Sequence, residues 1–366
     1  MIKSEKSLKQ AGFAVLDRST LNFVSDMSDR DQLNSRGMAA VIYGEGVVTN
    51  LEFHRNGKHL VMTTNESSIH LIDSLAGKET KKLYAKSSGI GKLQYTHNES
   101  CILLTSQQPK KNNDIKYLCM YDNRHLRAFQ GHGSDMVTSL SMSPIDDNFI
   151  SCSNRTINLW NLSSPNPLAI LQLPQHMEDV CVSYDGSGVV FGVMANDTAT
   201  KTRHIRLYDA RNYDKGPFED LAPTNISLHN AFAKKMQSQF NAISITQRMV
   251  QCQWTGFEFS SDGLHILVNT NTDAVLVLDG FKKEIEPMVV MRKNESGIAL
   301  GSCFSTAATE ILTANEDNEI VVFNKTRCDV METWTGHAGP PACLKCNPKY
   351  DIVASACSNT VLWLPI

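Results

Sequence analysis

The sequence predicts an all-β fold, a seven-bladed β-propeller in which each blade is a small antiparallel sheet. Two observations indicate it. A strand pattern of alternating apolar residues recurs seven times along the 366 residues, and a tight turn between two further strands precedes most copies. Because a single blade cannot bury both of its faces, seven such units are expected to pack side by side and close into a ring.

The recurring strand pattern consists of β-branched, aliphatic or aromatic residues followed by Asp or Asn in every copy except the last. Two of the spacings between copies, from 122 to 161 and from 324 to 365, are close to the period of about 40 residues that is typical of WD repeats. The longer spacings indicate inserted loops. The seven copies end at Asp73, Asp122, Asn161, Asp209, Asp279, Asn324 and Pro365.

The turns upstream of these strands predict β-hairpins. Asn56-Gly57 and Asp262-Gly263 each stand between two runs that read as strands. Asn-Gly and Asp-Gly readily adopt the positive φ angles that tight hairpin turns require. Each repeat is therefore expected to be a hairpin-rich antiparallel sheet, that is, one blade.

A Gly-His pair precedes two of the blades and supplies His132 and His337. In WD repeats this histidine hydrogen-bonds an aspartate in the turn before the third strand. The matching turns here carry Asn154 and Asn359, so we expect a weaker network. A buried hydrogen bond that ties strands together is a better interpretation of both histidines than catalysis.

Trp160 and Trp363 occupy equivalent places near the end of the recurring strand in the third and seventh copies. An aromatic side chain of this size is expected to be buried when it stands on an alternating strand of a propeller. We predict that both tryptophans have a structural role and pack between neighbouring blades.

The last blade needs an outer strand from another part of the chain, because the sequence ends at Ile366, directly after the third strand of that blade. Near the N-terminus, residues 13–16 read Phe13-Ala14-Val15-Leu16. This apolar run is the predicted closing strand, and it would join the two ends of the chain within one sheet.

Two segments interrupt the repeats within the predicted single domain of residues 1–366. Residues 19–46 are polar and rich in Ser, Asp and Gly, which predicts a loop insertion. Residues 223–251 account for the longest spacing and predict a helical insertion with an apolar stripe. That stripe either packs on its own blade or docks a partner. Its members are Phe232, Met236, Phe240 and Ile243.

Composition limits the function classes. Apolar residues make up 42% of the chain and charged residues 20%, so a large core is possible and disorder is excluded. The net charge of −3 is not that of a protein that binds nucleic acid with its whole surface. The apolar runs are no longer than strands, and the N-terminus has no signal-like apolar core, so we expect an intracellular protein without a membrane segment.

The ten cysteines include one closely spaced pair, Cys343 and Cys346. A CxxC motif can be redox-active or form half of a zinc site. However, the sequence has no second CxxC and no histidine pair at ligand spacing, and in a strand the two residues point to opposite faces. Buried structural thiols are the favoured interpretation.

The sequence contains no combination of residues that indicates an enzyme. It has no phosphate-binding loop, metalloprotease motif, nucleophile elbow or calcium loop. We therefore predict no catalytic, cofactor-binding or metal-binding residues, and no small-molecule substrate. Aromatic or methionine anchors beside charges make binding hot spots. The candidate partner-binding residues of this type are Tyr213, Asp214, Lys215, Phe218, Phe232, Met236 and Phe240.

From about residue 47 onward, the sequence resembles the WD repeat-containing protein 82 (Swd-two) family. The most specific stretches are Asp-Lys-Gly-Pro-Phe at 214–218 and Asn-Pro-Lys-Tyr at 347–350. It departs from the family at residues 19–46, 223–251 and 153–155. Further matching stretches are residues 95–97, 114–118, 140–144, 208–211, 254–256 and 354–359.

The resemblance implies a non-catalytic nuclear adaptor. Members of this family are subunits of COMPASS-type histone lysine-4 methyltransferases, of protein phosphatase 1 complexes with a PNUTS-type subunit, and in yeast of the cleavage and polyadenylation factor. The family is also linked to the phosphorylated tail of RNA polymerase II. A WD-repeat adaptor of another class, such as a ubiquitin-ligase substrate receptor, is the alternative, although no helical motif of the kind that it needs flanks the repeats.

Overall fold

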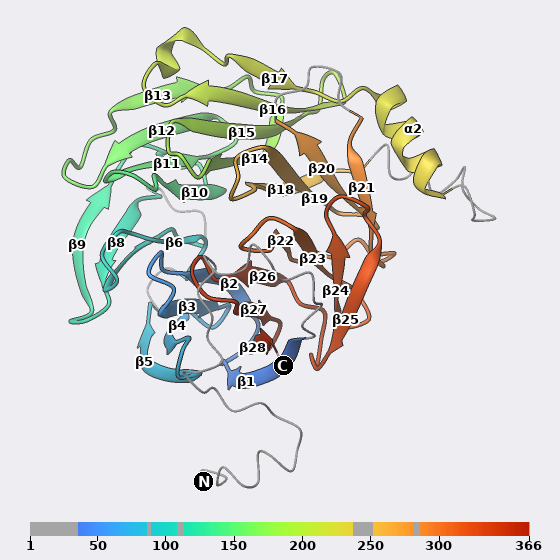
Figure 1. The fold of residues 1–366 in the computed structure, drawn as a ribbon. Coiled ribbons are helices and arrows are strands. Elements are labelled where there is room, and N and C mark those ends of the chain that lie inside the picture. Colours follow the sequence, from blue (N-terminus) through green and yellow to red (C-terminus); the bar gives the residue numbers. More distant parts are fainter. Residues whose placement is uncertain (1–35, 86–88, 108–112, 237–251, 281–285, 366) are drawn as a thin grey trace, which may run out of the picture. The chain divides into compact units, whose positions relative to one another are not determined.

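The computed structural model describes the chain apart from residues 1–35, 86–88, 108–112, 237–251, 281–285 and 366. It contains seven four-stranded sheets, and these are the blades of the predicted seven-bladed β-propeller (Figure 1). The chain divides into two compact units, residues 1–101 with 300–366 and residues 102–299.

Six blades take their strands in chain order. Blade 1 holds β2 (Val48–Phe53), β3 (His59–Thr64), β4 (Ser68–Asp73) and β5 (Lys78–Tyr84); blade 2 holds β6 (Leu93–Tyr95), β7 (Cys101–Leu104), β8 (Ile115–Cys119) and β9 (Arg124–Phe129); blade 3 holds β10 (Ser139–Met142), β11 (Asn148–Cys152), β12 (Thr156–Asn161) and β13 (Ala169–Gln172). Blade 4 holds β14 (Met177–Tyr184), β15 (Val190–Asp197), β16 (Thr202–Asp209) and β17 (Glu219–Leu221); blade 5 holds β18 (Trp254–Phe259), β19 (His265–Thr270), β20 (Ala274–Asp279) and β21 (Met288–Met291); blade 6 holds β22 (Ser302–Phe304), β23 (Glu310–Ala314), β24 (Glu319–Asn324) and β25 (Val330–Thr335).

The recurring strand pattern of the sequence corresponds to the third strand of each blade. These strands are β4, β8, β12, β16, β20 and β24, and in blade 7 the strand β28 (Asn359–Pro365). In blade 2 the strand ends at Cys119, three residues before the predicted end, and the chain then turns. The predicted hairpin turns are present as well, because Gly57 and Gly263 have φ angles of 72° and 71°.

Blade 7 combines the two ends of the described chain. Its strands run in the order β1 (Arg36–Tyr43), β28, β27 (Val353–Ala356) and β26 (Cys343–Cys346). The pairing of β1 with β28 is antiparallel, from Arg36 opposite Pro365 to Tyr43 opposite Asn359, with one bulge between Met38 and Ala40. An N-terminal strand therefore completes the last blade, as predicted.

The predicted location of this closing strand was wrong. Residues 13–16 lie outside the described residues, and β28 has β1 on one side and β27 on the other, so no edge remains for Phe13 to Leu16. The strand β1 also lies inside the segment 19–46 that was predicted as a loop. The run from Ala39 to Ile42 is continuously apolar rather than alternating, which suits a strand that is covered on both faces.

Arg36, the first residue of β1, forms ion pairs with two other residues of the unit that comprises residues 1–101 and 300–366. Its side chain, which is almost fully buried, bonds Asp351 Oδ1 at 2.9 Å and Glu310 Oε2 at 3.1 Å. The guanidinium carbon also lies 5.6 Å from the ring centroid of Trp334. Burial alone would lower the pKa of Arg36, but the two carboxylates outweigh it and raise that pKa. The first residue of β1 is therefore held by charge as well as by the ladder.

In blade 3, the predicted structural histidine and tryptophan share one hydrogen-bonded chain. The Trp160 indole N–H donates to Ser151 Oγ at 2.8 Å, and Ser151 Oγ lies 2.6 Å from His132 Nε2. His132 Nδ1 lies 3.1 Å from Thr156 Oγ1, so Thr156 takes the place expected of Asn154. A neutral His132 with its proton on Nδ1 satisfies both contacts, with the serine hydroxyl donating to Nε2.

Blade 7 repeats the arrangement. The Trp363 indole N–H donates to Ser355 Oγ at 2.7 Å, and Ser355 Oγ lies 2.6 Å from His337 Nε2. His337 Nδ1 lies 3.3 Å from Cys357 Sγ, and the Cys357 thiol in turn donates to Asn359 Oδ1 at 2.8 Å. The expected residue, Asn359, thus belongs to the hydrogen-bonded network, but it is linked to His337 through the Cys357 thiol.

Both tryptophans pack between blades, as predicted. Trp160 is fully buried in a cluster that includes Leu103 and Phe129 of blade 2 and Phe149 of blade 3. Trp363 of blade 7 is packed with apolar residues of blade 6, including Trp334, whose ring centroid is 5.2 Å away. The two equivalent positions therefore fill the space between adjacent sheets.

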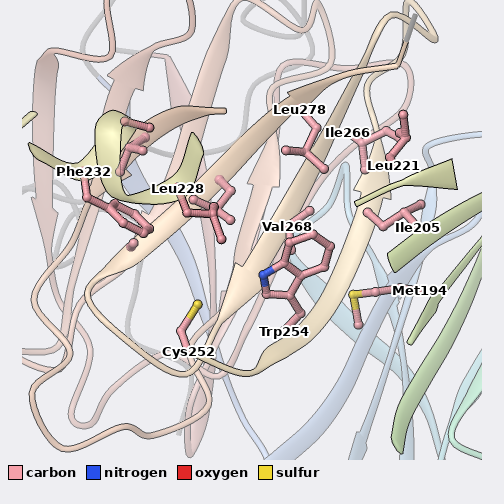
Figure 2. Close-up of a cluster of buried hydrophobic side chains, with 14 of the residues drawn as sticks. Met194, Ile205, Leu221, Leu228, Phe232, Cys252, Trp254, Ile266, Val268 and Leu278 are labelled. Atoms are coloured by element: carbon pink, nitrogen blue, oxygen red, sulfur yellow. The ribbon is translucent and has the colours of Figure 1, made fainter. Parts of the chain in front are cut away.

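The inserted segment begins with a helix, α2 (Asn225–Met236), which packs against β21 (Figure 1). Its inner face carries Leu228, Ala231 and Phe232, and all three are buried in a cluster with Trp254 of β18 (Figure 2). The first of the two alternatives, packing on the protein itself, therefore holds for Phe232. Phe240 and Ile243 fall among residues that the structure does not describe.

The CxxC cysteines stand at the two ends of β26. All ten cysteines are free thiols, and Cys343 and Cys346 are both half-buried. Cys346 Sγ lies 3.6 Å from Cys303 Sγ on β22 of the neighbouring blade.

Among the described helices, none has the length and apolar character that crossing a membrane requires.

The two buried histidines predict a pH-dependent stability. Burial lowers the pKa values of His132 and His337 from 6.5 to about 4. Each histidine then binds a proton more readily in the unfolded chain than in the folded protein. The contribution of the two neutral histidines to the free energy of unfolding is therefore fully present above about pH 6.5 and is lost as the pH falls toward 4. At pH 5 the loss is about 2 kcal/mol for each histidine.

Urea unfolding of the full chain between pH 7.5 and 5 measures this loss. The double variant His132→Asn with His337→Asn should be less stable at pH 7.5 but should change less with pH. An equal pH dependence in the wild type and the double variant would contradict the assignment.

The packing of α2 predicts unequal effects for two of its apolar residues. Phe232→Ala should lower the free energy of unfolding by about 3–5 kcal/mol, because the buried ring leaves a cavity. Ile226→Ala should change it by less than about 0.5 kcal/mol, because that side chain is exposed. Urea midpoints of both variants provide the check, and a Phe232→Ala cost under about 1 kcal/mol would show that α2 is only loosely attached.

Candidate interaction surface on blade 4

The loop between β16 and β17 carries four of the predicted partner-binding residues. It contains a single turn of 3-10 helix, Tyr213–Lys215, which ends at Gly216 with a φ of 83°. A positive φ of this size favours glycine, since a side chain there would be strained. The backbone N–H of Phe218 then bonds the Leu207 carbonyl at 2.9 Å and returns the chain to the sheet.

Asp209, the last residue of β16, organises the start of this loop. Its carboxylate accepts bonds from the backbone N–H of Arg211 at 2.9 Å, from the Arg211 guanidinium at 3.1 and 3.3 Å, and from the Asn212 amide at 3.2 Å. These bonds, led by the Arg211 side chain, lower the pKa of Asp209 to about 2. The loop is therefore fixed by its own side chains before any partner arrives.

The fixed loop presents the aromatic ring of Phe218 to solvent. Phe218 is 57% exposed, and the side chains of Asp214 and Lys215 are exposed close to it in sequence. Tyr213 faces the other way and packs on the cluster that joins blades 3 and 4. Of the four predicted loop residues, three are exposed to solvent, whereas Tyr213 anchors the loop by packing against the apolar cluster.

The outer strand β17 carries a polar network on the same blade. Asp220 accepts bonds from His204 Nδ1 at 3.0 Å and from Arg206 Nε at 3.2 Å, both on β16. Burial opposes ionisation of Asp220, but these two partners outweigh it and lower its pKa. Asp220 of β17 thus partly neutralises the charge of Arg206 on β16.

Three residues separate the end of β17 from the start of helix α2. Thr224 Oγ1 accepts the backbone N–H of Ser227 at 3.1 Å and caps the helix. Ile226, in the first turn, is 74% exposed, and Lys234 and Lys235 are exposed in the last turn. The helix therefore buries one face on the protein and presents an apolar residue and two cations elsewhere.

The loop and the helix stand at opposite ends of β17. Phe218 precedes the strand and Ile226 follows it, and three strand residues span about 10 Å. We use the name blade 4 rim for a set of exposed residues in three neighbouring segments: the loop before β17, β17 itself and the first turn of α2. The residues of the blade 4 rim are Asp214, Lys215, Phe218, Asp220 and Ile226. It mixes apolar side chains with both signs of charge, as protein-binding surfaces do.

The prediction from sequence found only part of this rim. It missed Ile226, which lies off the stripe that contains Phe232, and an apolar residue on the outer face of an amphipathic helix is a readable signal of exposure. Phe232 is buried and does not belong to the rim, and Met236 is the last residue of α2. Phe240 belongs to the part of the chain that is not described.

The exposed residues of the rim are of the kinds found at protein-binding surfaces. In the described part of the chain, no three His, Cys, Asp or Glu side chains gather in a group that could hold a metal ion. The lowered pKa of Asp209 follows from the hydrogen bonds of its turn, and the lowered pKa values of His132 and His337 follow from burial. What the rim offers is a rigid surface of hydrophobic anchors beside charges.

Comparison with known proteins supports the repeat assignment. Residues 123–161, which span β9 to β12, match the family model described as "WD domain, G-beta repeat". WD repeat-containing protein 82 of Drosophila melanogaster is 31% identical over 86% of this chain and 89% of its own length. "Set1 complex component swd2" of Schizosaccharomyces pombe is 26% identical over 83% of this chain and 76% of its own length.

A budding-yeast relative has a similar relationship. "COMPASS component SWD2" of Saccharomyces cerevisiae is 26% identical over 85% of this chain and 88% of its own length. The matches cover most of both proteins in each case, so they concern the whole set of blades and not one repeat. The chain belongs to the WD repeat-containing protein 82 family.

Proposed function

We propose that the protein is a non-catalytic scaffold subunit of a COMPASS-type histone lysine methyltransferase complex in the nucleus. The observation that carries the proposal is that relatives covering most of the chain are named as Set1 and COMPASS components. The rigid blades and the preformed blade 4 rim are consistent with a subunit that positions other proteins. The protein itself then contributes no reacting group.

A finer proposal concerns further assemblies. The family resemblance also points to a phosphatase complex with a PNUTS-type subunit, to the cleavage and polyadenylation machinery, and to the phosphorylated tail of RNA polymerase II. One scaffold can serve several complexes because each partner needs only a small set of anchors on a shared rigid surface. We propose the methyltransferase complex as the primary assignment and these as additional ones.

Affinity purification of the tagged full chain from nuclear extract, with mass spectrometry of the bound proteins, tests the assignment. The expected result is recovery of a SET-domain methyltransferase and its other subunits. Recovery of phosphatase or polyadenylation subunits in addition would support the finer proposal. Recovery of cullin-type ubiquitin ligase subunits without a methyltransferase would contradict the assignment and favour a substrate receptor.

The blade 4 rim predicts which variant loses partners. Phe218→Ser combined with Ile226→Ser should remove at least one specific partner, because exposed apolar anchors contribute most of the binding energy at such surfaces. The melting temperature should stay within about 2 °C of wild type, since both side chains are exposed.

Leu264→Ser is the matched control, because Leu264 is an exposed apolar residue of similar size on a hairpin turn of blade 5. It should leave the set of recovered proteins unchanged. An unchanged set for the double variant as well would show that the rim does not bind the partners of the complex.

A further inference from the structure

The outer strand of blade 3 differs from the other outer strands of the described sheets. An outer strand has unpaired backbone groups along one side, and proteins usually guard it with charged residues or cover it. Strands β5, β9, β17 and β25 each contain charged residues, and β21 is covered by α2. The remaining outer strand, β1, begins at Arg36, which is buried in ion pairs with Asp351 and Glu310. Strand β13 contains no charged residue, and none of the described helices or strands covers its outer edge.

The lack of charge extends well beyond β13. Between Arg155 and Glu178 the sequence contains no Asp, Glu, Lys or Arg. Within this stretch Leu168 is 56% exposed and Ile170 is 44% exposed. Leu168 and Ile170 are two positions apart, so their exposed aliphatic side chains lie next to each other on the same face of an uncharged edge strand. Proteins normally avoid this pattern at the edge of a sheet.

The two faces of β13 are used differently. Ala169, Leu171 and Leu173 pack against the core between blades 3 and 4. The alternate residues, Ile170 and Gln172 within the strand, point away from that core, because side chains alternate along a strand. The exposed face is thus a short apolar strip held in place by a packed face behind it.

The backbone of β13 is also suitable for pairing. The Leu173 N–H bonds the Arg155 carbonyl at 2.8 Å, and Ile157 and Leu171 are opposite each other in the ladder with β12. Hydrogen-bonded positions alternate in an antiparallel pair. The N–H and C=O groups of Ile170 and Gln172 therefore face outward, away from β12. Strand β13 is the outer strand of blade 3 (Figure 1).

One charge stands at the end of this edge. Arg155 is next to the C-terminal end of β13 through the bond just described, and its side chain is 72% exposed. Its ion pair with Asp135 is long, at 3.9 Å, so its guanidinium remains accessible to a second carboxylate. The edge therefore offers an apolar centre with a cation at one end.

We propose that β13 is a docking edge for an extended segment of a partner protein, which adds to blade 3 as a fifth, antiparallel strand. Main-chain hydrogen bonds to Ile170 and Gln172 give affinity, and alternate apolar side chains cover Leu168 and Ile170. In the antiparallel direction the N-terminus of the segment lies beside Arg155, so an acidic residue belongs there. The assignment is independent of which complex the protein joins.

The ladder is short and its length is limited at both ends. Pro165 and Pro167 precede the strand and Pro174 follows it, and a proline lacks the N–H that a longer ladder would need. The docked segment therefore has about four to six residues in register with β13. A contact of this size suits a weak, reversible interaction rather than a permanent one.

A display library of random heptapeptides, selected on the full chain and counter-selected on Ile170→Lys, tests the proposal. Lysine at Ile170 places a charge at the centre of the edge, as guarded outer strands do. The selected peptides should alternate apolar residues and begin with Asp or Glu. The best peptide, measured by fluorescence anisotropy, should bind Ile170→Lys at least about tenfold more weakly than wild type, because the lysine charge would be buried without a partner.

Two further variants make the test specific. Leu264→Lys, on an exposed leucine of blade 5, should bind the peptide as wild type does. Arg155→Glu should weaken binding, and a peptide with lysine in place of its acidic residue should restore it. Melting temperatures confirm that each variant is folded, and Leu168→Lys replaces Ile170→Lys if that variant is not.

Three results would overturn the proposal. The first is that no peptide distinguishes wild type from the charged variants. The second is that the charge exchange at Arg155 has no effect, which would remove the assigned direction. The third is that the full chain dimerises in sedimentation velocity through an interface that Ile170→Lys abolishes, since a second copy would then be the occupant of the edge.

Discussion

Strand β1 pairs with β28 from Arg36 to Tyr43, and blade 7 depends on this pairing. The other six blades take four strands from one continuous stretch of chain, so each is completed locally. Blade 7 is completed only when a strand from near the N-terminus meets the C-terminal strand. Ile42 of β1 enters the same apolar cluster as Leu51 of blade 1 and Leu362 of β28, so the pairing also joins the two blades that meet there.

The buried polar chains depend on the same alignment of strands. Ser355 can receive the indole N–H of Trp363 and meet His337 only if β27 and β28 keep their register. Each member of such a chain uses its donors and acceptors on the others, so a shift of one strand would leave several buried polar atoms unsatisfied. The main effect of the network is therefore to favour one register of the strands, and its net contribution to stability is smaller.

Much of the fold could be predicted because its signals are local. The strand periodicity recurs in every blade, the Gly turns in several and the equivalent tryptophans in two, so seven blades could be predicted from the sequence. The closing strand could not be located, because Arg36 and Pro365, which pair in the sheet, lie near opposite ends of the sequence and the N-terminal region contains two apolar runs. Helical spacing likewise identified the stripe of α2, but not the surface against which Phe232 would pack.

The interaction surfaces were harder to predict than the fold, because they depend on what remains exposed after packing. The sequence of β13 reads as an ordinary apolar strand, and only its position at the edge of blade 3 makes Ile170 notable. In the same way, Tyr213 and Phe218 look alike in a loop, yet one supports the loop and the other is exposed. Two aromatic residues of one loop thus take different roles once the blades fix the direction of their side chains.

Hydrogen exchange of the backbone amides in β1 tests the central claim most directly. If β1 is an integral strand of blade 7, its ladder amides should exchange as slowly as those of β27, with the same free energy of opening, because both require loss of the whole sheet. Amides of β1 that exchange orders of magnitude faster than those of β27, while β27 and β28 remain protected, would show that blade 7 is stable without its N-terminal strand and would contradict the account.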